Sequence, residues 1–144
     1  MGLMRLGKMP PLVSPDATVL DAVHLMIAET VGALAVTKED DRLVGVFTER
    51  DLMKRVVARG LDPTTTPVAE VMTTGVRTVC DDTTVSQAID MMRTGHFRHL
   101  PIVDEDGRIK SMVALRYLLY DVMDDLEAKV DSLEGYLMED SRGG

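Results

Sequence analysis

Two polar side chains in the first half of the chain have the types and the spacing to hold a phosphorylated sugar. Thr48 and Asp51 lie three residues apart at the predicted start of a helix, close to its unpaired N–H groups. The threonine hydroxyl can reach a phosphate there, and the two carboxylate oxygens of Asp51 can accept hydrogen bonds from both hydroxyls of a ribose. The same pair is also ordinary helix-capping chemistry, so the motif alone leaves both interpretations open.

No motif typical of an enzyme accompanies this pair. The sequence contains no Gly-rich phosphate loop, no nucleophile elbow and no paired His–Glu metal motif. The histidines His24, His96 and His99 have no second ligand at metal spacing. We therefore expect a protein that binds without catalysing a reaction, with no metal site and no cofactor.

The composition limits the setting and the partners. The chain has 144 residues, a single cysteine (Cys80) and no apolar run near the length that spans a bilayer. One cysteine cannot form an intramolecular disulfide, which favours a reducing, cytoplasmic location without a membrane partner. The net charge is −8, and −6 of it falls from Asp121 onward. Nucleic acid is not expected as a partner, because it requires a basic face.

An internal repeat organises the chain. A shift of 66 positions aligns Ser14–Val56 with Cys80–Val122 without a gap. Identical pairs include Asp16/Asp82, Thr18/Thr84, Val19/Val85, Ala22/Ala88, Met26/Met92, Leu34/Leu100, Arg42/Arg108, Arg50/Arg116 and Leu52/Leu118. Two copies of one supersecondary unit are therefore predicted.

Each copy has the pattern of a strand, a helix, two strands and a helix. In the first copy, helical spacing places Val19, Ala22, Val23, Met26 and Ile27 on one face. Two apolar runs, 33–36 and 43–47, flank a polar turn and predict a hairpin, and residues 100–103 and 109–113 repeat it. A second helix after Thr48 is predicted to carry Leu52, Met53, Val56 and Val57, with Met53 on its core face. A unit of this size cannot cover both faces of its sheet, so the two sheets are expected to pack together.

The resulting fold class is α+β, with two tandem β-α-β-β-α repeats and a long C-terminal helix. We divide the chain into a first repeat with an N-terminal arm (1–66), a second repeat (67–122) and an acidic helical extension (123–144). Within that last helix, an apolar stripe continues past the repeat at Leu126, Val130, Leu133 and Leu137. A lone helix with such a stripe needs a packing surface, and a partner subunit is the expected one.

Several motifs resemble the cystathionine-β-synthase-type (CBS) domain family. They are Thr-Val-x-x-Ala at the first helix of each copy, Gly45-Val46-Phe47-Thr48-Glu49-Arg50-Asp51, Val71-Met72-Thr73 and His99-Leu100-Pro101-Ile102-Val103-Asp104. The resemblance covers residues 12–122 and implies a paired module with pseudo-twofold symmetry that usually forms a homodimer. It also implies clefts between the repeats that hold AMP, ADP or ATP, or in some members S-adenosylmethionine or a dinucleotide.

The resemblance also implies roles for particular residues. Asp51 would bind the ribose, with Thr73, Thr74, Val76 and Arg77 around the sugar and base. Thr48, Arg98, His99 and His96 would face the phosphates, because Arg is the natural bidentate phosphate partner and a protonated His adds charge.

The second copy departs from this pattern at the corresponding place. Ala114 and Tyr117 stand where the first copy has Thr48 and Asp51, and neither can replace the lost hydroxyl or carboxylate. We therefore expect one nucleotide per chain, in a regulatory sensor module. Two alternatives stay open: a structural dimerisation module with vestigial clefts, and a binder of S-adenosylmethionine or a dinucleotide.

Overall fold

The structure is a computed structural model that describes residues 2–143, and the side chains of residues 2–135 and 137. Met1 and Gly144, the outer ends of the predicted divisions, lie outside the described residues. The first half contains η1 (Leu3–Leu6), β1 (Leu12–Val13), α1 (Val19–Glu29), β2 (Ala33–Thr37), η2 (Glu39–Asp41), β3 (Leu43–Thr48), α2 (Glu49–Asp51) and η3 (Leu52–Val57). The second half contains α3 (Val68–Val71), α4 (Val85–Gly95), β4 (His99–Val103), β5 (Ile109–Ala114) and α5 (Leu115–Gly143).

The predicted repeat is confirmed in the backbone for the first helix and the hairpin of each copy, whereas the opening strand of the second copy is reduced to a single bridge between Val79 and Ile102. Thr18 and Thr84, 66 positions apart, each cap a helix through a capping box. Both helices then end on a left-handed residue, Thr30 or His96. The hairpins correspond too, and each carries a register shift near the end of its first strand. The same local signals therefore begin and end the same elements in both copies.

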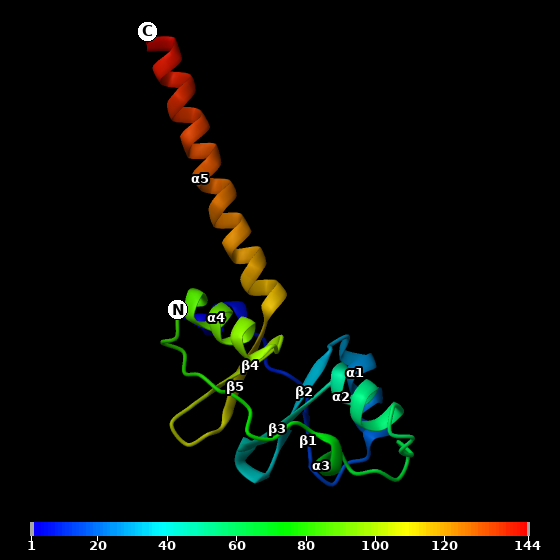
Figure 1. The fold of residues 1–144 in the computed structure, drawn as a ribbon. Helices are drawn as coiled ribbons and strands as arrows, with labels where there is room; N and C mark the ends of the chain where they lie inside the picture. The colour runs from blue at the N-terminus through cyan, green and yellow to red at the C-terminus, as the bar shows by residue number, and fades with distance from the viewer. Residues whose placement is uncertain (1, 144) are drawn as a thin grey trace.

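Two small sheets pack against each other between the repeats (Figure 1). One sheet has the order β1-β2-β3, and the other pairs β4 with β5. A shared cluster of mostly small side chains joins them, with Ala33, Ala35 and Val46 from the first repeat and Ile109 and Met112 from the second. The predicted sheet-to-sheet packing is therefore confirmed, and each repeat also has its own helix-covered core.

The pseudo-twofold axis passes between two equivalent arginines. Arg42 and Arg108, which occupy the same position in the two repeats, form an antiparallel bridge with each other. Two equivalent residues can pair directly only where the axis relates them. The symmetry predicted from the repeat is thus visible at this bridge.

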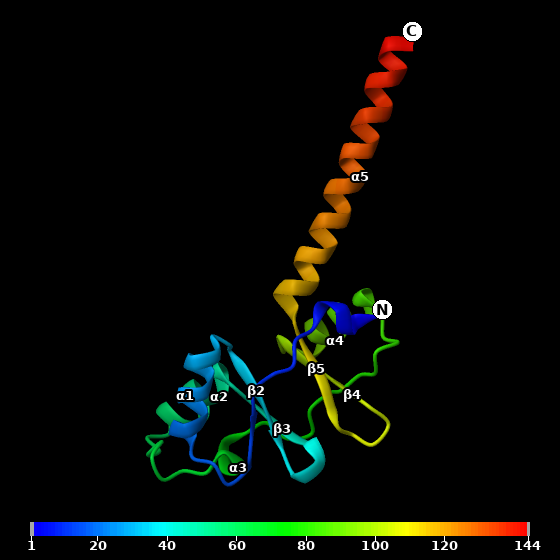
Figure 2. The same cartoon turned by 180° about the vertical axis from the view of Figure 1, so that it is seen from behind.

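The segments that precede the two repeats are exchanged between them. The N-terminal η1 lies against β5 and α4, and Leu3 is fully buried in the core of the second repeat (Figures 1 and 2). The equivalent α3 buries Val68 and Val71 in the core of the first repeat. Leu3 N donates a hydrogen bond to Asp81 O. The equivalent pair in the repeat alignment, Ala69 N and Pro15 O, forms the same bond. Each repeat is completed by the segment that leads into the other, and the boundary at 66/67 stays a prediction.

The C-terminal helix leaves the repeats after its first turns and extends alone (Figures 1 and 2). Leu118 is buried in the core of the second repeat, and Arg5 of the N-terminal arm forms an ion pair with Asp121 at 3.2 Å. These contacts fix the base of α5, while later apolar side chains are exposed. No helix within residues 2–143 is both long and apolar enough to cross a membrane.

Three apolar side chains of the two predicted helices are exposed, among them Met53, which we expected on a core face. Met53 and Val57 lie on η3, which is a π-helix, with Ala58 N bonded to Met53 O. The equivalent residues of the second repeat, Leu119 and Met123, are exposed too although α5 is a regular α-helix, so these positions face away from the core in both repeats. Ile27, near the end of α1, is 70% exposed and lies at the edge of a cleft. The buried face of each of these two helices is therefore narrower than its run of apolar residues predicts.

Candidate binding cleft between the repeats

A cleft of about 920 Å³ separates the helical side of the first repeat from the second repeat. Its first wall is mainly apolar and comes from α1, the turn after it and the α2–η3 helix: Val23, Met26, Ile27, Thr30, Val31, Gly32, Glu49 and Leu52. Its second wall comes from β4, the end of β5 and the start of α5: Arg98, His99, Ala114, Leu115, Arg116 and Leu119. A volume of this order is typical of small-molecule sites.

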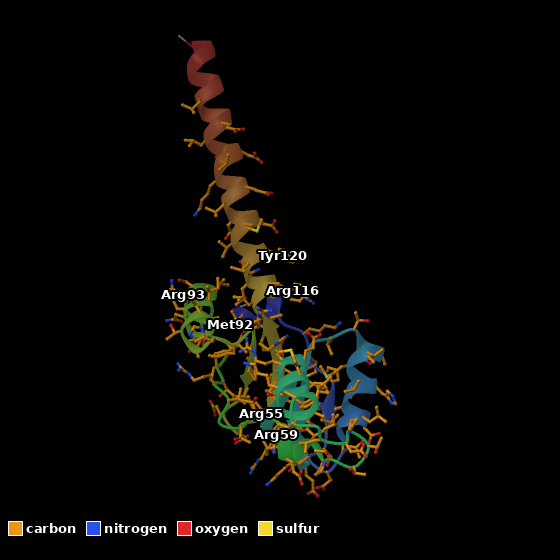
Figure 3. The ribbon with its side chains drawn as sticks, turned by 45° about the vertical axis from the view of Figure 1, so that its right-hand side comes forward. Arg55, Arg59, Met92, Arg93, Arg116 and Tyr120 are labelled. Carbon is orange, nitrogen blue, oxygen red and sulfur yellow. The ribbon has the colours of Figure 1, made fainter. Side chains whose placement is uncertain are left out.

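The second wall carries the basic groups. Arg98 and His99 lie at the start of β4, and the pairing of His99 with Ala114 places β4 beside the end of β5. Arg116 follows two residues later, at the base of α5 (Figure 3). Its guanidinium lies 5.0 Å from the centre of the Tyr117 ring and donates a 3.3 Å hydrogen bond to the tyrosine hydroxyl. The predicted phosphate residues Arg98 and His99 are therefore together, with a third basic side chain beside them.

Glu49 faces this basic wall from the first repeat. Burial lowers the pKa of His99 below its ordinary value of 6.5; the Glu49 carboxylate opposes that shift, and Arg116 and Arg98 add to it. His99 is therefore mostly neutral at pH 7 and can accept a proton when an anion enters the cleft. The cleft thus contains one negative group and a histidine that can gain charge.

Asp51 is not among the residues that line this cleft and lies instead in a polar cluster with Thr48, Arg55 and Thr73. One carboxylate oxygen, Oδ2, accepts from the Thr48 backbone N–H at 3.0 Å and from its hydroxyl at 3.2 Å. The other, Oδ1, accepts from the Thr73 hydroxyl at 2.9 Å and lies 3.6 Å from Arg55 Nε. Asp51 is only 4% exposed. The capping interpretation of Thr48 and Asp51 is therefore confirmed, and Asp51 also links the first repeat to the segment that leads into the second.

The other predicted residues are spread over three places. Val76 lines a smaller hollow of about 240 Å³ with Gly45 and Gly75. Thr74 and Arg77 are exposed on the same connecting segment. His96 is exposed at the end of α4, where its backbone carbonyl accepts a 3.0 Å hydrogen bond from Arg50. The structure thus brings Arg98 and His99 together, and separately Thr48, Asp51 and Thr73.

The two departures in the second repeat differ in position. Ala114 lines the large cleft beside Arg98 and His99, so the missing hydroxyl leaves space next to the basic wall. Tyr117 is exposed, and its ring contacts Arg116 and, edge to face, Tyr120. The expectation of one nucleotide per chain, rather than two, stays a prediction.

Sequence reasoning missed three charged residues at these sites: Glu49, Arg55 and Arg116. Arg55 follows Asp51 by one helical turn, and its guanidinium also donates to Met72 O at 2.9 Å. Arg50 and Arg116 occupy equivalent positions in the two repeats. The sequence therefore does not indicate that Arg116, and not Arg50, lines the large cleft. Among the residues that the structure describes, no cluster of His, Cys, Asp or Glu could hold a metal ion.

Two α+β repeats that exchange their leading segments, with a cleft between them, define a paired-repeat fold. The chain belongs to the CBS domain family, whose model matches residues 7–58 and 68–124. A CBS domain-containing protein of Arabidopsis thaliana is 37% identical over 128 residues, which are 88% of this chain and 23% of that relative. The chain therefore spans about a quarter of that relative's length.

Solved structures show the same fold. A CBS-domain containing protein from Agrobacterium tumefaciens is 32% identical with a TM-score of 0.74, over 83% of this chain and 94% of that chain. CBSX2, solved in complex with AMP, is 22% identical with a TM-score of 0.72, over 85% of this chain and 96% of that chain. The second similarity shows the fold alone.

Proposed function

We propose that this protein is a non-catalytic regulatory module that binds an adenosine nucleotide between its repeats. The observation that carries the proposal is the large cleft, in which Arg98, His99 and Arg116 face a mainly apolar wall. A nucleotide has the complementary shape and chemistry, with an anionic phosphate end and an apolar base. Arginine side chains can bind the phosphate end, and apolar side chains can pack against the base.

We assign the phosphate end to the basic wall. Two arginines and a histidine that gains charge can neutralise one or more phosphates, whereas the Glu49 carboxylate limits how much negative charge the cleft accepts. AMP, ADP and ATP are all candidates, and S-adenosylmethionine fits less well because its sulfonium is cationic. The solved complex of CBSX2 with AMP supports this class of ligand.

The ribose is proposed to bind at Asp51. Its neighbours in sequence, Glu49 and Leu52, line the large cleft, and its Oδ1 is held by Thr73 from the segment that leads into the second repeat. A ribose diol would replace the hydrogen bond from Thr73 and take the same acceptor oxygen. Binding at this point would therefore act on the junction between the repeats.

Ligand binding can be tested by calorimetry and by thermal shift with AMP, ADP, ATP, S-adenosylmethionine and NADH, each added separately. A ligand that binds only the folded protein raises the melting temperature by mass action. We expect a shift with at least one adenosine phosphate and no turnover of it. A stable dimer that binds none of these ligands would favour the structural dimerisation alternative.

The ribose assignment is tested with Asp51→Ala. We expect loss of nucleotide binding, and also a loss of about 1–3 kcal/mol in stability because a buried acceptor and a helix cap are removed. The matched control is Asp21→Ala, which removes the equivalent capping-box acid of α1. This control should lose about 0.5–2 kcal/mol in stability and keep binding. Equal binding by both variants would refute the assignment.

A further inference from the structure

The exposed part of α5 carries one continuous apolar seam with the spacing of a coiled coil. Its members are Leu119, Met123, Leu126, Val130, Leu133 and Leu137, each 43–60% exposed. The intervals between them alternate strictly between four and three residues, so they occupy the d and a positions of successive heptads. A seam of this kind over about 28 Å of helix is more than a solitary surface helix requires.

The seam residues also indicate how many helices meet. Leucine occupies every d position, and the central a position is the β-branched Val130. This combination favours two strands over three or four. The described acids of the extension lie outside the seam, on its flanks and outer face: Asp121, Asp124, Asp125, Glu127, Asp131 and Glu134. Pairing through the seam therefore leaves those charges towards water.

The flanking charges discriminate between the two possible directions. Lys129 is at position g, and Glu127 and Glu134 are at position e. In a parallel pair, position g of one helix faces position e five residues later in its partner, so Lys129 meets Glu134 of the second copy twice. In an antiparallel pair, e faces e and g faces g. In the antiparallel register that pairs Val130 with Leu133, Glu127 would then meet Glu134 of the second copy, a contact between like charges.

We infer that α5 pairs with α5 of a second copy as a parallel two-stranded coiled coil. The inference deepens the homodimer expected for this fold and does not depend on nucleotide binding. Because α5 starts directly on the second repeat, a parallel pair places the two second repeats side by side at one end. Both C-termini then emerge together, about 43 Å away along the 29-residue helix. An antiparallel pair would instead put the two modules at opposite ends of the rod.

Cysteine cross-linking of the full chain distinguishes the two directions. In a Cys80→Ser background, Val130→Cys places a thiol at an a position that faces itself only in a parallel pair. We expect most of the oxidised protein to run as a covalent dimer on a non-reducing gel. Asp131→Cys, one residue further on and outside the seam, is the matched control and should stay monomeric on the gel. Both positions are exposed, so neither substitution threatens the fold.

A charge-exchange series tests the same contact through equilibrium association. Lys129→Glu alone and Glu134→Lys alone each place like charges opposite each other in the parallel pair. We expect each to raise the dimer dissociation constant several-fold by analytical ultracentrifugation, and the double variant to restore it. In an antiparallel pair, Glu134→Lys would instead tighten the dimer, because it would face Glu127.

Two outcomes would overturn the inference. One is a parent protein that remains monomeric at tens of micromolar. The other is a Val130→Cys protein that fails to cross-link alone but cross-links with a Leu133→Cys copy, which is the antiparallel signature. A parallel dimer that binds no nucleotide would leave this inference intact and contradict only the function proposed for the cleft.

Discussion

His99 is the residue through which pH acts on the cleft. Its pKa lies below 6.5 in the free protein, mainly because of burial. A bound phosphate raises that pKa, since it favours the charged imidazole, so binding takes up a proton. Affinity for a nucleotide should therefore increase as pH falls from about 8 to 6 and level off below the pKa of the free form. Calorimetry across this range measures the effect, and His99→Gln should remove most of it.

The lowered pKa of His99 also makes the stability of the fold depend on pH. For stability, unlike nucleotide affinity, low pH is unfavourable. Because the folded protein holds His99 at a lowered pKa, the unfolded chain takes up this proton first as the pH falls below 6.5. The contribution of His99 to stability is present above that pH and is lost as the pH falls through its folded pKa. Added nucleotide should reduce this loss, and melting curves with and without ligand at pH 5.5 and 7.5 measure it. An identical pH dependence in both series would contradict the assignment of His99 to the phosphate.

Glu49 is predicted to restrain affinity. Glu49→Gln removes a negative charge that faces the basic wall, so phosphate-bearing ligands should bind about two- to five-fold more tightly, with the larger gain for ATP. Titration calorimetry with AMP and ATP measures both values. Glu39→Gln, in the turn between β2 and β3, is the charge-matched control and should change neither. A weaker ATP complex in Glu49→Gln would show that Glu49 helps to bind ligand.

At the scale of the elements, the two exchanged segments, η1 and α3 with the residues that follow each, approach the sheets closely. A Cβ on Gly7 would collide with Ser111 Oγ, and a Cβ on Gly45 would meet Met72 Sδ at 2.7 Å. Gly7 lies on the exchanged N-terminal arm, which approaches β5. Gly45 lies on β3, which the residues after α3 approach. Each crossing thus has a glycine on one side of the contact.

Gly7→Ala should therefore destabilise the protein by about 1–3 kcal/mol, because the arm must move away from β5. Gly135→Ala is the control, since a Cβ there meets nothing within 4 Å and the residue lies inside α5. That change should stabilise the helix by about 0.5–1 kcal/mol. Urea denaturation curves give both values, and equal effects of the two changes would contradict the close approach.

The elements also show how far the sequence can be interpreted. The gapless repeat predicted both helices, both hairpins and their symmetry, because capping and turn residues act locally in each copy. The exposure of Met53 and Val57 could not be predicted, since helical spacing does not say which apolar positions the rest of the repeat covers, and the equivalent Leu119 and Met123 are exposed as well. Arg116 was missed for a similar reason. Only the packing of α5 on the second repeat decides that this arginine, and not Arg50, lines the cleft.

For the whole molecule, the exchanged segments make the two repeats one folding unit. Leu3 is fully buried in the second core although it precedes the first repeat. Leu3→Ala should cost about 2–5 kcal/mol. It should lower a single melting transition rather than split it, because neither repeat is complete alone. Calorimetry would show two transitions if the repeats were independent. Met4→Ala, on the same arm but exposed, should have little effect.

The crossing of η1 and α3 has a consequence for how such a chain can be divided. Two separate copies of a single repeat, each lending its leading segment to the other, would form a domain-swapped dimer with the same contacts. In this protein the swap is closed within one polypeptide, and residues 58–67 serve as the tether between its halves. Cutting that tether should therefore yield two fragments that fold poorly apart and reassemble when mixed.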